Sequence, residues 1–522
     1  MTHWADKTAE RILKLQTAPS PPGGALQLTC ASGISPSGPV HVGNLRDIVT
    51  IWFVGKAIKE KGAPVRLLHS WDNYDRFRKV PANTPANFTE FIGRPLSKVP
   101  DPFNCCPSYA AHYEKEFETS LLEMGIEIEF LNQTKLYESG LYCDAILEAV
   151  SKRHAIYDIL QKFRTQAGSS EERDGYYPIT LYCERCGKDT TQVSATSSES
   201  HIAYHCTECQ HDGEQDLKHA RNIKLPWKVD WAMRWRHEKV VFEPGGKDHA
   251  TAGGSFEVSS EIAKDIFHYR PPIFQPYEFI GLKGLTGKMS GSSGVLLTPG
   301  DALKVYQPEV LLSVFAKMPP NKAFDLVLDD GIYRVYDEFD RANSKTPLER
   351  EIALSRIPGR SPHAVAFKQL ASFCGIVQGN DAALELIFTR MGTPYKSELF
   401  EERLQKAENW LSEYAPEQRL VLREKRDDDY FNALTPAQKN WIVSLYDFLA
   451  TKQCTLDEAT HEVYEIPKKD QPPDTDLIPH QRDFFKIIYH LLFGKEKGPR
   501  LGTFFAAVPK EQYLSLLEFR TG

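Results

Sequence analysis

The chain has 522 residues, of which 41% are hydrophobic and 25% are charged. This balance is typical of a globular protein, and the length suggests about three domains of about 100–200 residues each. The formal net charge of -7 argues against a chain that is basic throughout. It does not exclude RNA as a partner, because a large enzyme needs only a local basic surface to neutralise phosphates.

The N-terminal residues give no sign of export. Residues 1–16 mix charged and apolar side chains and contain no apolar stretch of the kind found in secretory signals. Nowhere do about 18 apolar residues run together, so we expect no membrane partner. We therefore expect a cytoplasmic, reducing location, in which the ten cysteines are thiols or metal ligands rather than disulfides.

Strand and helix patterns alternate at the N-terminal end. Residues 26–31 form a short apolar run that predicts a buried strand, and a Gly/Ser/Pro loop follows at residues 32–39. Apolar residues at helical spacing begin at Leu45, and Gly62 predicts the end of that helix. Residues 65–71 predict the next strand. This strand–loop–helix–strand order is the start of a parallel, doubly wound α/β sheet.

The middle of the chain is more irregular. Residues 80–108 carry many Pro and Asn residues and look like an insertion, and a helix is predicted at residues 144–162. Residues 165–222 are polar and contain a cluster of cysteines. Strand patterns return at residues 239–242 and 277–281.

Amphipathic helices dominate after about residue 345. One begins with Thr435 as its cap and Pro436 in its first turn, and another carries apolar residues between Leu404 and Tyr414. A third ends at Gly494. We therefore predict that the C-terminal part is a separate helical domain.

Four cysteines have the spacing of a zinc ribbon. Two Cys-x2-Cys pairs are separated by residues 187–205, within the C-x2-C-x15–20-C-x2-C pattern. The four predicted ligands are Cys183, Cys186, Cys206 and Cys209. Because no position is left open for catalysis, we predict a structural Zn2+ that stabilises a segment without an apolar core. A redox pair is the alternative, although one Cys-x2-Cys pair would suffice for it.

The other cysteines carry less information. Cys105 and Cys106 are adjacent and have no partner at metal-binding spacing. The rest are expected to pack as small apolar side chains, namely Cys30, Cys143, Cys374 and Cys454.

The first segment with chemical meaning is Pro39-Val40-His41-Val42-Gly43-Asn44, between the first strand and the first helix. A helix start offers free N–H groups and the positive end of the helix dipole, which suit a phosphate. His41 can donate to phosphate oxygens, and Gly43 lets a base or sugar approach the backbone. A capped helix start with an exposed histidine is the alternative.

The second segment is Gly287-Lys288-Met289-Ser290-Gly291-Ser292-Ser293-Gly294. It is too rich in Gly and Ser for a stable helix or strand, so it predicts a loop that carries one ammonium group. Lys288 on such a loop could stabilise the charge that develops on a triphosphate during displacement. A flexible surface linker is the alternative.

Together, the two segments resemble the two signature sequences of class I aminoacyl-tRNA synthetases, which are written HIGH and KMSKS. Two positions differ, because Asn44 replaces the second His and the second Lys is replaced within Gly291-Ser292-Ser293. Residues 33–44, 71–81 and 336–341, with the Lys-Met-Ser loop, look like the class I lysyl-tRNA synthetases in particular. The resemblance covers the chain to about residue 345.

The resemblance implies the domain organisation. A Rossmann-like catalytic domain would occupy residues 1–285, with an insertion at about 80–230 that contains the zinc ribbon at about 176–215. A KMSKS-type loop and linking region would follow at 286–345, and a helical anticodon-binding domain at 346–522. The expected fold class is therefore α/β with a parallel sheet and an all-α C-terminal domain.

The resemblance also implies the reaction. L-Lysine would attack the α-phosphate of ATP, with Mg2+ present, and the lysyl group would pass from the adenylate to tRNA(Lys) for protein synthesis. Positioning and charge stabilisation dominate such chemistry, and the expected catalytic residues are His41, Asn44 and Lys288. The residues expected to contact the nucleotide are Pro39, His41, Gly43, Asn44, Lys288, Met289 and Ser290. A monomer is favoured.

The amino-acid pocket must pair the lysine ammonium with a carboxylate, because an unpaired buried charge is strongly unfavourable. Asp72 and Asp75 follow a predicted strand, at the edge where parallel sheets bind ligands. A surface turn or a helix cap is the alternative for each. The other expected substrate contacts, each of which could instead be a core or satisfied polar residue, are Gly33, Ser35, Trp231, Asp248, His249, Tyr277 and Phe279.

Two other functions stay open at this point. A class I synthetase could activate another amino acid, since lysine specificity rests on the resemblance. A non-catalytic tRNA-binding relative could keep the scaffold, although the presence of both His41 and Lys288 argues against it.

Overall fold

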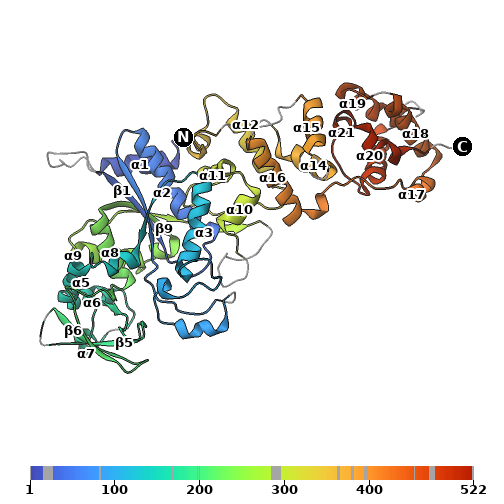
Figure 1. Ribbon diagram of the computed structural model, residues 1–522. Helices are drawn as coiled ribbons and strands as arrows, with labels where there is room; N and C mark the ends of the chain where they lie inside the picture. The colour runs from blue at the N-terminus through green and yellow to red at the C-terminus, as the bar shows by residue number, and fades with distance from the viewer. Residues whose placement is uncertain are drawn as a thin grey trace. The chain divides into compact units, whose positions relative to one another are not determined.

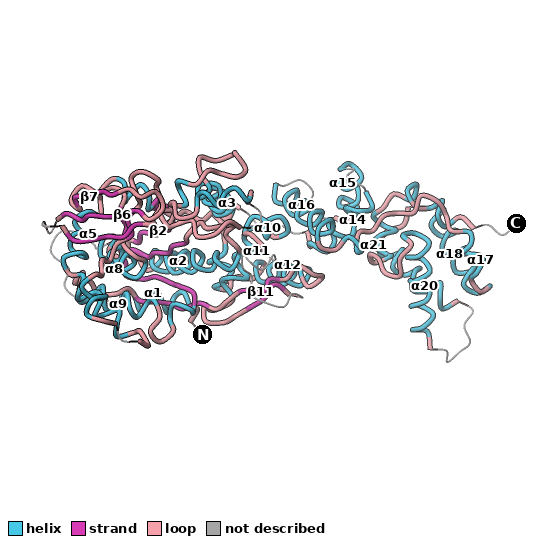
Figure 2. Tube along the Cα trace, turned by 90° about the horizontal axis from the view of Figure 1, so that it is seen from below, coloured by secondary structure: helices cyan, strands magenta, loops and turns pink. Residues whose placement is uncertain are grey.

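The computed structural model describes residues 2–15, 27–81, 84–166, 168–196, 198, 200–283, 296–360, 365–377, 381–392, 398–451, 453–469 and 476–519. The chain divides into two compact units. The α/β unit comprises residues 1–303, 308–326 and 349–358, and the helical unit comprises residues 304–307, 327–348 and 359–522. All strands of the described chain, magenta in Figure 2, belong to the α/β unit.

A five-stranded parallel sheet forms the centre of the α/β unit (Figure 1). Its strands, in spatial order, are β10 (Ile273–Tyr277), β9 (Val240–Gly246), β1 (Leu28–Ile34), β2 (Val65–Trp71) and β3 (Glu129–Asn132). Every neighbouring pair is parallel. The first five residues of β1 are buried, as expected for a strand in a sheet that is covered on both faces. The predicted fold class is confirmed.

The strand order reverses direction at β1. The chain passes from β1 to β2 and β3 on one side, and β9 and β10 are added on the other side. Such a reversal leaves a crevice at the carboxyl ends of the two central strands, where open α/β sheets bind ligands. The carboxyl ends of β1 and β9 are therefore the place where a site is expected.

Helix α2 (Val42–Glu60) makes the crossover from β1 to β2. Fourteen of its 19 residues are buried, because it contacts the sheet and also helices α1 (Trp4–Lys14) and α11 (Pro308–Lys317). Gly55 lies against Leu67, where a Cβ would come within 2.7 Å of the leucine side chain. The helix is therefore held in place along most of its length.

The rest of the α/β unit consists of short helices and three smaller sheets. The helices are α3 (Tyr109–Glu123), α4 (Gln133–Glu138), α5 (Cys143–Ser151), α6 (Arg153–Lys162), α7 (Ser170–Asp174), α8 (Trp227–Glu238), α9 (Ser255–Asp265) and α13 (Arg350–Ser355), while α10 (Pro299–Val305) begins in this unit. The small sheets pair β4 (Thr180–Leu181) with β8 (Ile223–Lys224), β11 (Ile280–Leu282) with β12 (Phe324–Leu326), and β5 (Thr191–Ala195), β6 (His201–Cys206) and β7 (Asp212–Asp216) with one another.

The helical unit, orange to red in Figure 1, contains the C-terminal helices. They are α12 (Ile332–Asn343), α14 (Phe367–Val377), α15 (Asp381–Arg390), α16 (Glu398–Glu413), α17 (Asp428–Ala433), α18 (Pro436–Thr451), α19 (Leu456–Glu465), α20 (Leu477–Phe493) and α21 (Leu501–Ala507). Gly494 ends α20 in the left-handed conformation, with φ of 68°, as its glycine predicts. No helix in the described ranges has the length and apolar character needed to cross a membrane.

Two predicted elements differ from the structure. The single helix predicted at residues 144–162 is divided into α5 and α6, because Lys152 between them has φ of -100° and ψ of 20°. The strand predicted at residues 277–281 is also divided, since β10 ends at Tyr277 and β11 begins at Ile280. The first break is a change of backbone direction at one residue, and the second separates strands of two different sheets, neither of which apolar periodicity records.

Candidate active site and metal centres

His41 is the residue immediately before α2 and lies at the start of the helix. The N–H of Val42 donates to the carbonyl of Leu297 at 2.8 Å. The chain just beyond the Lys-Met-Ser segment is therefore held against the helix start that carries His41. The three predicted residues of that segment, Lys288, Met289 and Ser290, lie outside the described residues.

Gly43 is the position in this turn where a side chain would not fit. A Cβ there would lie 2.8 Å from the imidazole of His41, so the glycine leaves room for the ring beside the first turn. The N–H of Asn44 donates to the carbonyl of His41 at 2.9 Å, and Pro39 and Asn44 are partly exposed. The predicted nucleotide contacts from Pro39 to Asn44 are thus grouped at one helix start that solvent can reach.

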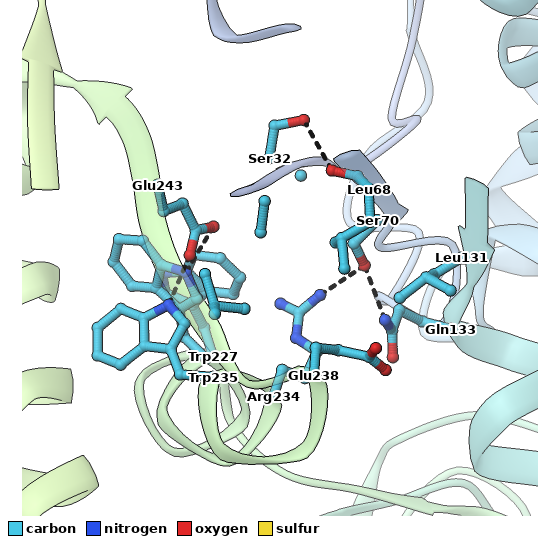
Figure 3. A pocket seen from close by; sticks show the side chains of 14 residues that line it. Ser32, Leu68, Ser70, Leu131, Gln133, Trp227, Arg234, Trp235, Glu238 and Glu243 are labelled. Carbon is cyan, nitrogen blue, oxygen red and sulfur yellow. Dashed lines mark hydrogen bonds between the residues drawn. The ribbon is translucent and has the colours of Figure 1, made fainter. Parts of the chain in front are cut away.

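A small cavity of about 20 Å³, enough for about one water molecule, lies between residues of β1, β2, β9 and α8. Figure 3 shows Arg234 pointing across it toward Ser70. The Arg234 guanidinium donates to Asp72 at 2.6 Å and to Ser70 Oγ at 2.7 Å, and it pairs with Asp230 at 3.2 Å. Asp72, predicted to bind substrate, is therefore a counter-ion of a buried arginine.

Asp75, the second predicted carboxylate, also has a cationic partner in the chain. It forms an ion pair with Lys224 of β8 and a hydrogen bond with the Ser35 hydroxyl. Burial acts to raise the pKa of Asp75, but Lys224 and the hydrogen bonds outweigh it and hold the pKa below its ordinary value. Ser35, predicted as a substrate contact, thus lies in this ion-pair network.

Three tryptophans, Trp227, Trp231 and Trp235, and the buried Glu243 also line the cavity, and Figure 3 shows Trp235 and Glu243 on the side opposite Ser70. The indole N–H groups of Trp231 and Trp235 donate to Glu243 at 3.0 and 2.5 Å. Burial raises the pKa of Glu243 to about 7, although the two indole bonds oppose the rise. Trp231 also stacks on Trp227, with ring centroids 4.9 Å apart. Trp231, predicted to contact the substrate, therefore lines this cavity with its indole N–H already bonded to Glu243.

Asp47, on the second turn of α2, is a candidate that the sequence analysis missed. It is 4% exposed, and its Oδ1 atom has no hydrogen-bond partner among the described residues. Burial and the nearby Glu243 raise the pKa of Asp47 well above its ordinary value, against a hydrogen bond from the Gly33 backbone. The sequence offered little signal for it, because Asp47 stands beside Arg46 in a helix that carries other charged residues.

Tyr277, at the end of β10, lies close to Asp47. Burial raises the pKa of the tyrosine, Asp47 and Asp248 add to the rise, and Arg46 opposes it. Tyr277 is therefore surrounded by charged groups of α2 and of the segment at Lys247–Ala250. The structure brings this predicted substrate contact to the same end of the sheet as Asp47.

Two further predicted contacts, His249 and Phe279, have different surroundings. Burial lowers the pKa of His249, whose ring centroid is 5.7 Å from that of Trp231. The ammonium of Lys247 lies 4.8 Å from the centre of the Phe279 ring. His249 therefore lies beside Trp231 of the cavity wall, whereas the Phe279 ring lies next to the exposed ammonium of Lys247.

The four predicted zinc ligands converge on one centre. Their Sγ atoms all lie within 4.8 Å of one another. The two closest distances, Cys183 to Cys209 and Cys186 to Cys206, are both 3.6 Å. A tetrahedral site with Zn–S bonds of about 2.3 Å has sulfur atoms about 3.8 Å apart. The arrangement therefore fits Zn2+ closely.

Two matching turns aim these thiols at the same point. Cys183 and Cys206 each donate their N–H to the carbonyl five residues later at 2.8 Å. Gly187 and Gln210 occupy the left-handed conformation directly after the second cysteine of each pair, with φ of 74° and 56°. The two halves of the site thus have the same backbone geometry.

The expectation that this segment lacks an apolar core is wrong. Ile202, Tyr204 and Leu217 are at most 2% exposed and belong to an apolar cluster shared with the rest of the α/β unit. Buried and partly exposed residues alternate along β6, so the composition of the strand is polar although one face is apolar. Apolar burial therefore stabilises the segment, and a bound metal would add to that stability.

A second group of possible metal ligands was not predicted. Ligand atoms of Asp101, Cys105, Cys106 and His112 all lie within 4.8 Å of one another. The Cys105 Sγ atom is 3.7 Å from that of Cys106 and 3.2 Å from His112 Nδ1. The adjacent cysteines therefore lie beside two further side chains that could serve as metal ligands. These side chains were missed because one precedes the pair and the other lies on α3, without a zinc-ribbon spacing.

A sequence profile of the class I (K) tRNA synthetases matches residues 2–357. The chain belongs to this family. The synthetase is 36% identical to a lysine–tRNA ligase of Treponema pallidum, over 99% of this chain and 98% of the relative. It is 34% identical to a lysine–tRNA ligase of Thermococcus kodakarensis over 98% of each chain, and 36% identical to one of Streptomyces coelicolor over 99% of this chain and 98% of the relative. The resemblance inferred from the motifs is confirmed.

Glu243 should make the stability of the synthetase depend on pH. Its pKa of about 7 in the folded state exceeds the ordinary value of 4.5, so raising the pH ionises the unfolded state first and favours unfolding. When the pH rises from 4.5 to 7, the free energy of unfolding of the wild type should fall by about 3 kcal/mol more than that of the Glu243→Gln variant. Urea unfolding at both pH values measures the difference. The same pH dependence in both proteins would contradict the prediction.

Removing one zinc ligand should release metal without full unfolding. Cys206→Ser should lower the zinc content by about one equivalent and Tm by about 5 °C or more, because the thiolate site contributes stability beside the apolar cluster. Atomic absorption and calorimetry measure the two effects. The control is Cys374→Ser, which changes a buried cysteine of the helical unit outside both ligand groups. An unchanged zinc content in Cys206→Ser would rule out the assigned site.

Proposed function

We propose that this synthetase activates L-lysine with ATP as lysyl-adenylate and transfers the lysyl group to tRNA(Lys) in protein synthesis. Relatives named lysine–tRNA ligases are 34–36% identical to it over nearly the whole chain. The structural observation that carries the proposal is the 2.8 Å hydrogen bond from Val42 to Leu297. It brings the chain beyond the Lys-Met-Ser segment to the helix start that carries His41, as a shared triphosphate site requires.

The start of α2 is the proposed phosphate site. The positive end of the helix dipole favours an anion there, and the first turn contains no acidic residue. His41 would donate to a phosphate oxygen, Asn44 would act as a neutral second donor, and Lys288 would supply an ammonium group. Mg2+ would share the triphosphate charge. The lysine carboxylate attacks and pyrophosphate leaves, so the protein contributes mainly positioning and charge stabilisation.

The lysine ammonium is assigned to Asp47 rather than to Asp72 or Asp75. Asp72 and Asp75 are each already paired with a cation of the chain. Asp47 is buried, and its Oδ1 atom has no hydrogen-bond partner in the described parts of the chain. A bound ammonium would satisfy that oxygen and favour the ionised carboxylate, whose pKa is otherwise high. Trp231 would flank the aliphatic stem of the substrate.

The metal groups are assigned structural roles. Zn2+ would be held by the four cysteines of the zinc ribbon, a closed set of thiolates that supplies stability and leaves no position for substrate. The second set of possible ligands, called the Asp101 group, consists of Asp101, Cys105, Cys106 and His112. Its oxygen, sulfur and nitrogen donors would also suit Zn2+. Both groups belong to the α/β unit.

The helical unit is the proposed anticodon-binding part. Tyr464 is 46% exposed on α19 and offers a ring on which an unpaired base can stack. The predicted domain limits, the cytoplasmic location and the monomeric state stay predictions.

Exchange of labelled pyrophosphate into ATP tests the function. With ATP and tRNA present, lysine should drive exchange at least about 100-fold faster than the other natural amino acids, the scale expected when a buried carboxylate selects a cation. The same assay without tRNA determines whether activation depends on it. Exchange driven by another amino acid would contradict the lysine assignment. No exchange under any condition would favour a tRNA-binding relative without catalysis.

Replacing Asp47 tests which carboxylate holds the ammonium. Asp47→Asn should raise the KM for lysine about 100-fold, because the substrate charge loses its counter-ion, while the KM for ATP changes less than about twofold. Steady-state pyrophosphate exchange measures both constants. Asp75→Asn is the comparison variant, since Asp75 already has Lys224 as partner. A larger effect on lysine KM at Asp75 than at Asp47 would transfer the assignment to Asp75.

A further inference from the structure

Arg46, next to Asp47 on α2, is a buried cation whose hydrogen bonds within the described residues go to backbone carbonyls. Its side chain donates to Glu278 at 2.8 Å and to Pro319 and Lys322 at 2.7 Å each. Arg46 is 2% exposed, and no carboxylate of the described residues lies within ion-pair distance, 4.0 Å, of it. The guanidinium also lies 5.2 Å from the centre of the Phe324 ring. The guanidinium therefore uses its hydrogen-bond donors to hold backbone carbonyls in place.

The three carbonyls belong to two segments that Arg46 joins to α2. Glu278 lies between β10 and β11, and Pro319 and Lys322 lie between α11 and β12. The two segments also contact each other, since the N–H of Glu278 donates to the carbonyl of Pro320 at 2.8 Å. A guanidinium is a planar fork of five donors and can serve several carbonyls at once, whereas a lysine ammonium is a point charge on a flexible stem.

The first of these segments carries Tyr277. The carbonyl that Arg46 holds belongs to the very next residue, and the tyrosine side chain senses the charges of Arg46 and Asp47. Successive residues of a helix point about 100° apart. One turn of α2 thus directs Asp47 toward the amino-acid site and Arg46 toward the backbone that carries Tyr277.

We propose that Arg46 is a positioning residue that holds the backbone beside Tyr277 against α2 and thereby sets the tyrosine opposite Asp47 for recognition of the amino acid. The proposal rests on the proposed function of this site. Without the guanidinium, three backbone carbonyls in part-buried hydrogen bonds lose their donor, which favours displacement of both segments. Arg46 acts through Tyr277 and need not contact the substrate.

Lys56 provides a matched control on the same helix. Its ammonium donates to the carbonyls of Leu354 and Arg356 at 2.8 and 3.0 Å and lies 5.0 Å from the centre of the Trp52 ring. Arg46 and Lys56 are both α2 cations that bind carbonyls beside an aromatic ring. Of these two cations, Arg46 is the one with an acceptor, Glu278, directly next to Tyr277.

The kinetic experiment compares Arg46→Met, Arg46→Lys and Lys56→Met with the wild type in lysine-dependent pyrophosphate exchange, with ATP and tRNA present. Arg46→Met should raise the KM for lysine about 10-fold or more and the KM for ATP less than about twofold. Arg46→Lys should lie between it and the wild type, and Lys56→Met should leave the KM for lysine unchanged. Equal effects of Arg46→Met and Lys56→Met would overturn the proposal.

A double-mutant cycle tests whether Arg46 acts through Tyr277. In a Tyr277→Phe background, adding Arg46→Met should raise the KM for lysine by less than about threefold, because the contact that Arg46 positions is already impaired. An effect as large as in the wild-type background would show that Arg46 acts elsewhere and would overturn the proposal.

Hydrogen exchange gives a readout that does not require activity. Arg46→Met should speed amide exchange about 10-fold in peptides that span residues 277–282 and 319–326, whereas Lys56→Met should do so only around residues 350–357. Unchanged exchange at residues 277–282 would overturn the positioning role. Failure of the wild type to use lysine, with this exchange pattern intact, would overturn the proposed function alone.

Discussion

The burial of α2 on nearly every side is the physical constraint on which the site depends. The helix crosses from β1 to β2 beneath two outer helices, and 14 of its 19 residues are buried. Its start therefore cannot move relative to the carboxyl ends of the central strands. Three residues at the start and in the first two turns of the helix therefore have defined places. His41 lies at the helix start, Arg46 donates to the backbone beside β10, and Asp47 lies near Gly33 and Glu243.

The charges around the cavity fall into two classes with different consequences. Arg234 is paired with Asp72 and Asp230, so its burial is compensated within the chain. Asp47, on the neighbouring helix, and Glu243 form no ion pair within the described residues, and both have raised pKa values because burial opposes ionisation. The network around Arg234 instead supports the shape of the wall.

The segments that follow β2 are stabilised differently from the central sheet. The four Sγ atoms of the ribbon lie within 4.8 Å of one another, and so do the oxygen, sulfur and nitrogen ligand atoms of the Asp101 group. The ribbon also contributes Ile202 and Tyr204 to the apolar cluster of the α/β unit. Lys224, which follows the ribbon, pairs with Asp75 next to β2. The ribbon is thereby connected to the sheet by apolar contacts and by a buried ion pair.

Local sequence signals determined much of this protein. The apolar run, Gly/Ser/Pro loop and helical spacing predicted β1 and α2, Gly494 predicted the end of α20, and Cys-x2-Cys spacing predicted the ribbon ligands. These signals succeed because they depend on neighbouring residues, which the backbone itself brings together. The strand order β10-β9-β1-β2-β3, in contrast, depends on pairing between distant segments.

Only the tertiary structure decided which charges are paired. Asp72 looked suited to bind a substrate ammonium, but its partner is Arg234, 162 residues further along the chain. Asp47 looked like one more charged helix residue, and burial beside Glu243 gives it a different character. Asp101 and His112 likewise lie beside Cys105 and Cys106 in the folded chain. This pair of cysteines, which was uninformative in the sequence, thereby becomes part of a possible metal-binding group. The sequence could not supply these results, because burial and ion pairing depend on distances across the folded chain rather than along it.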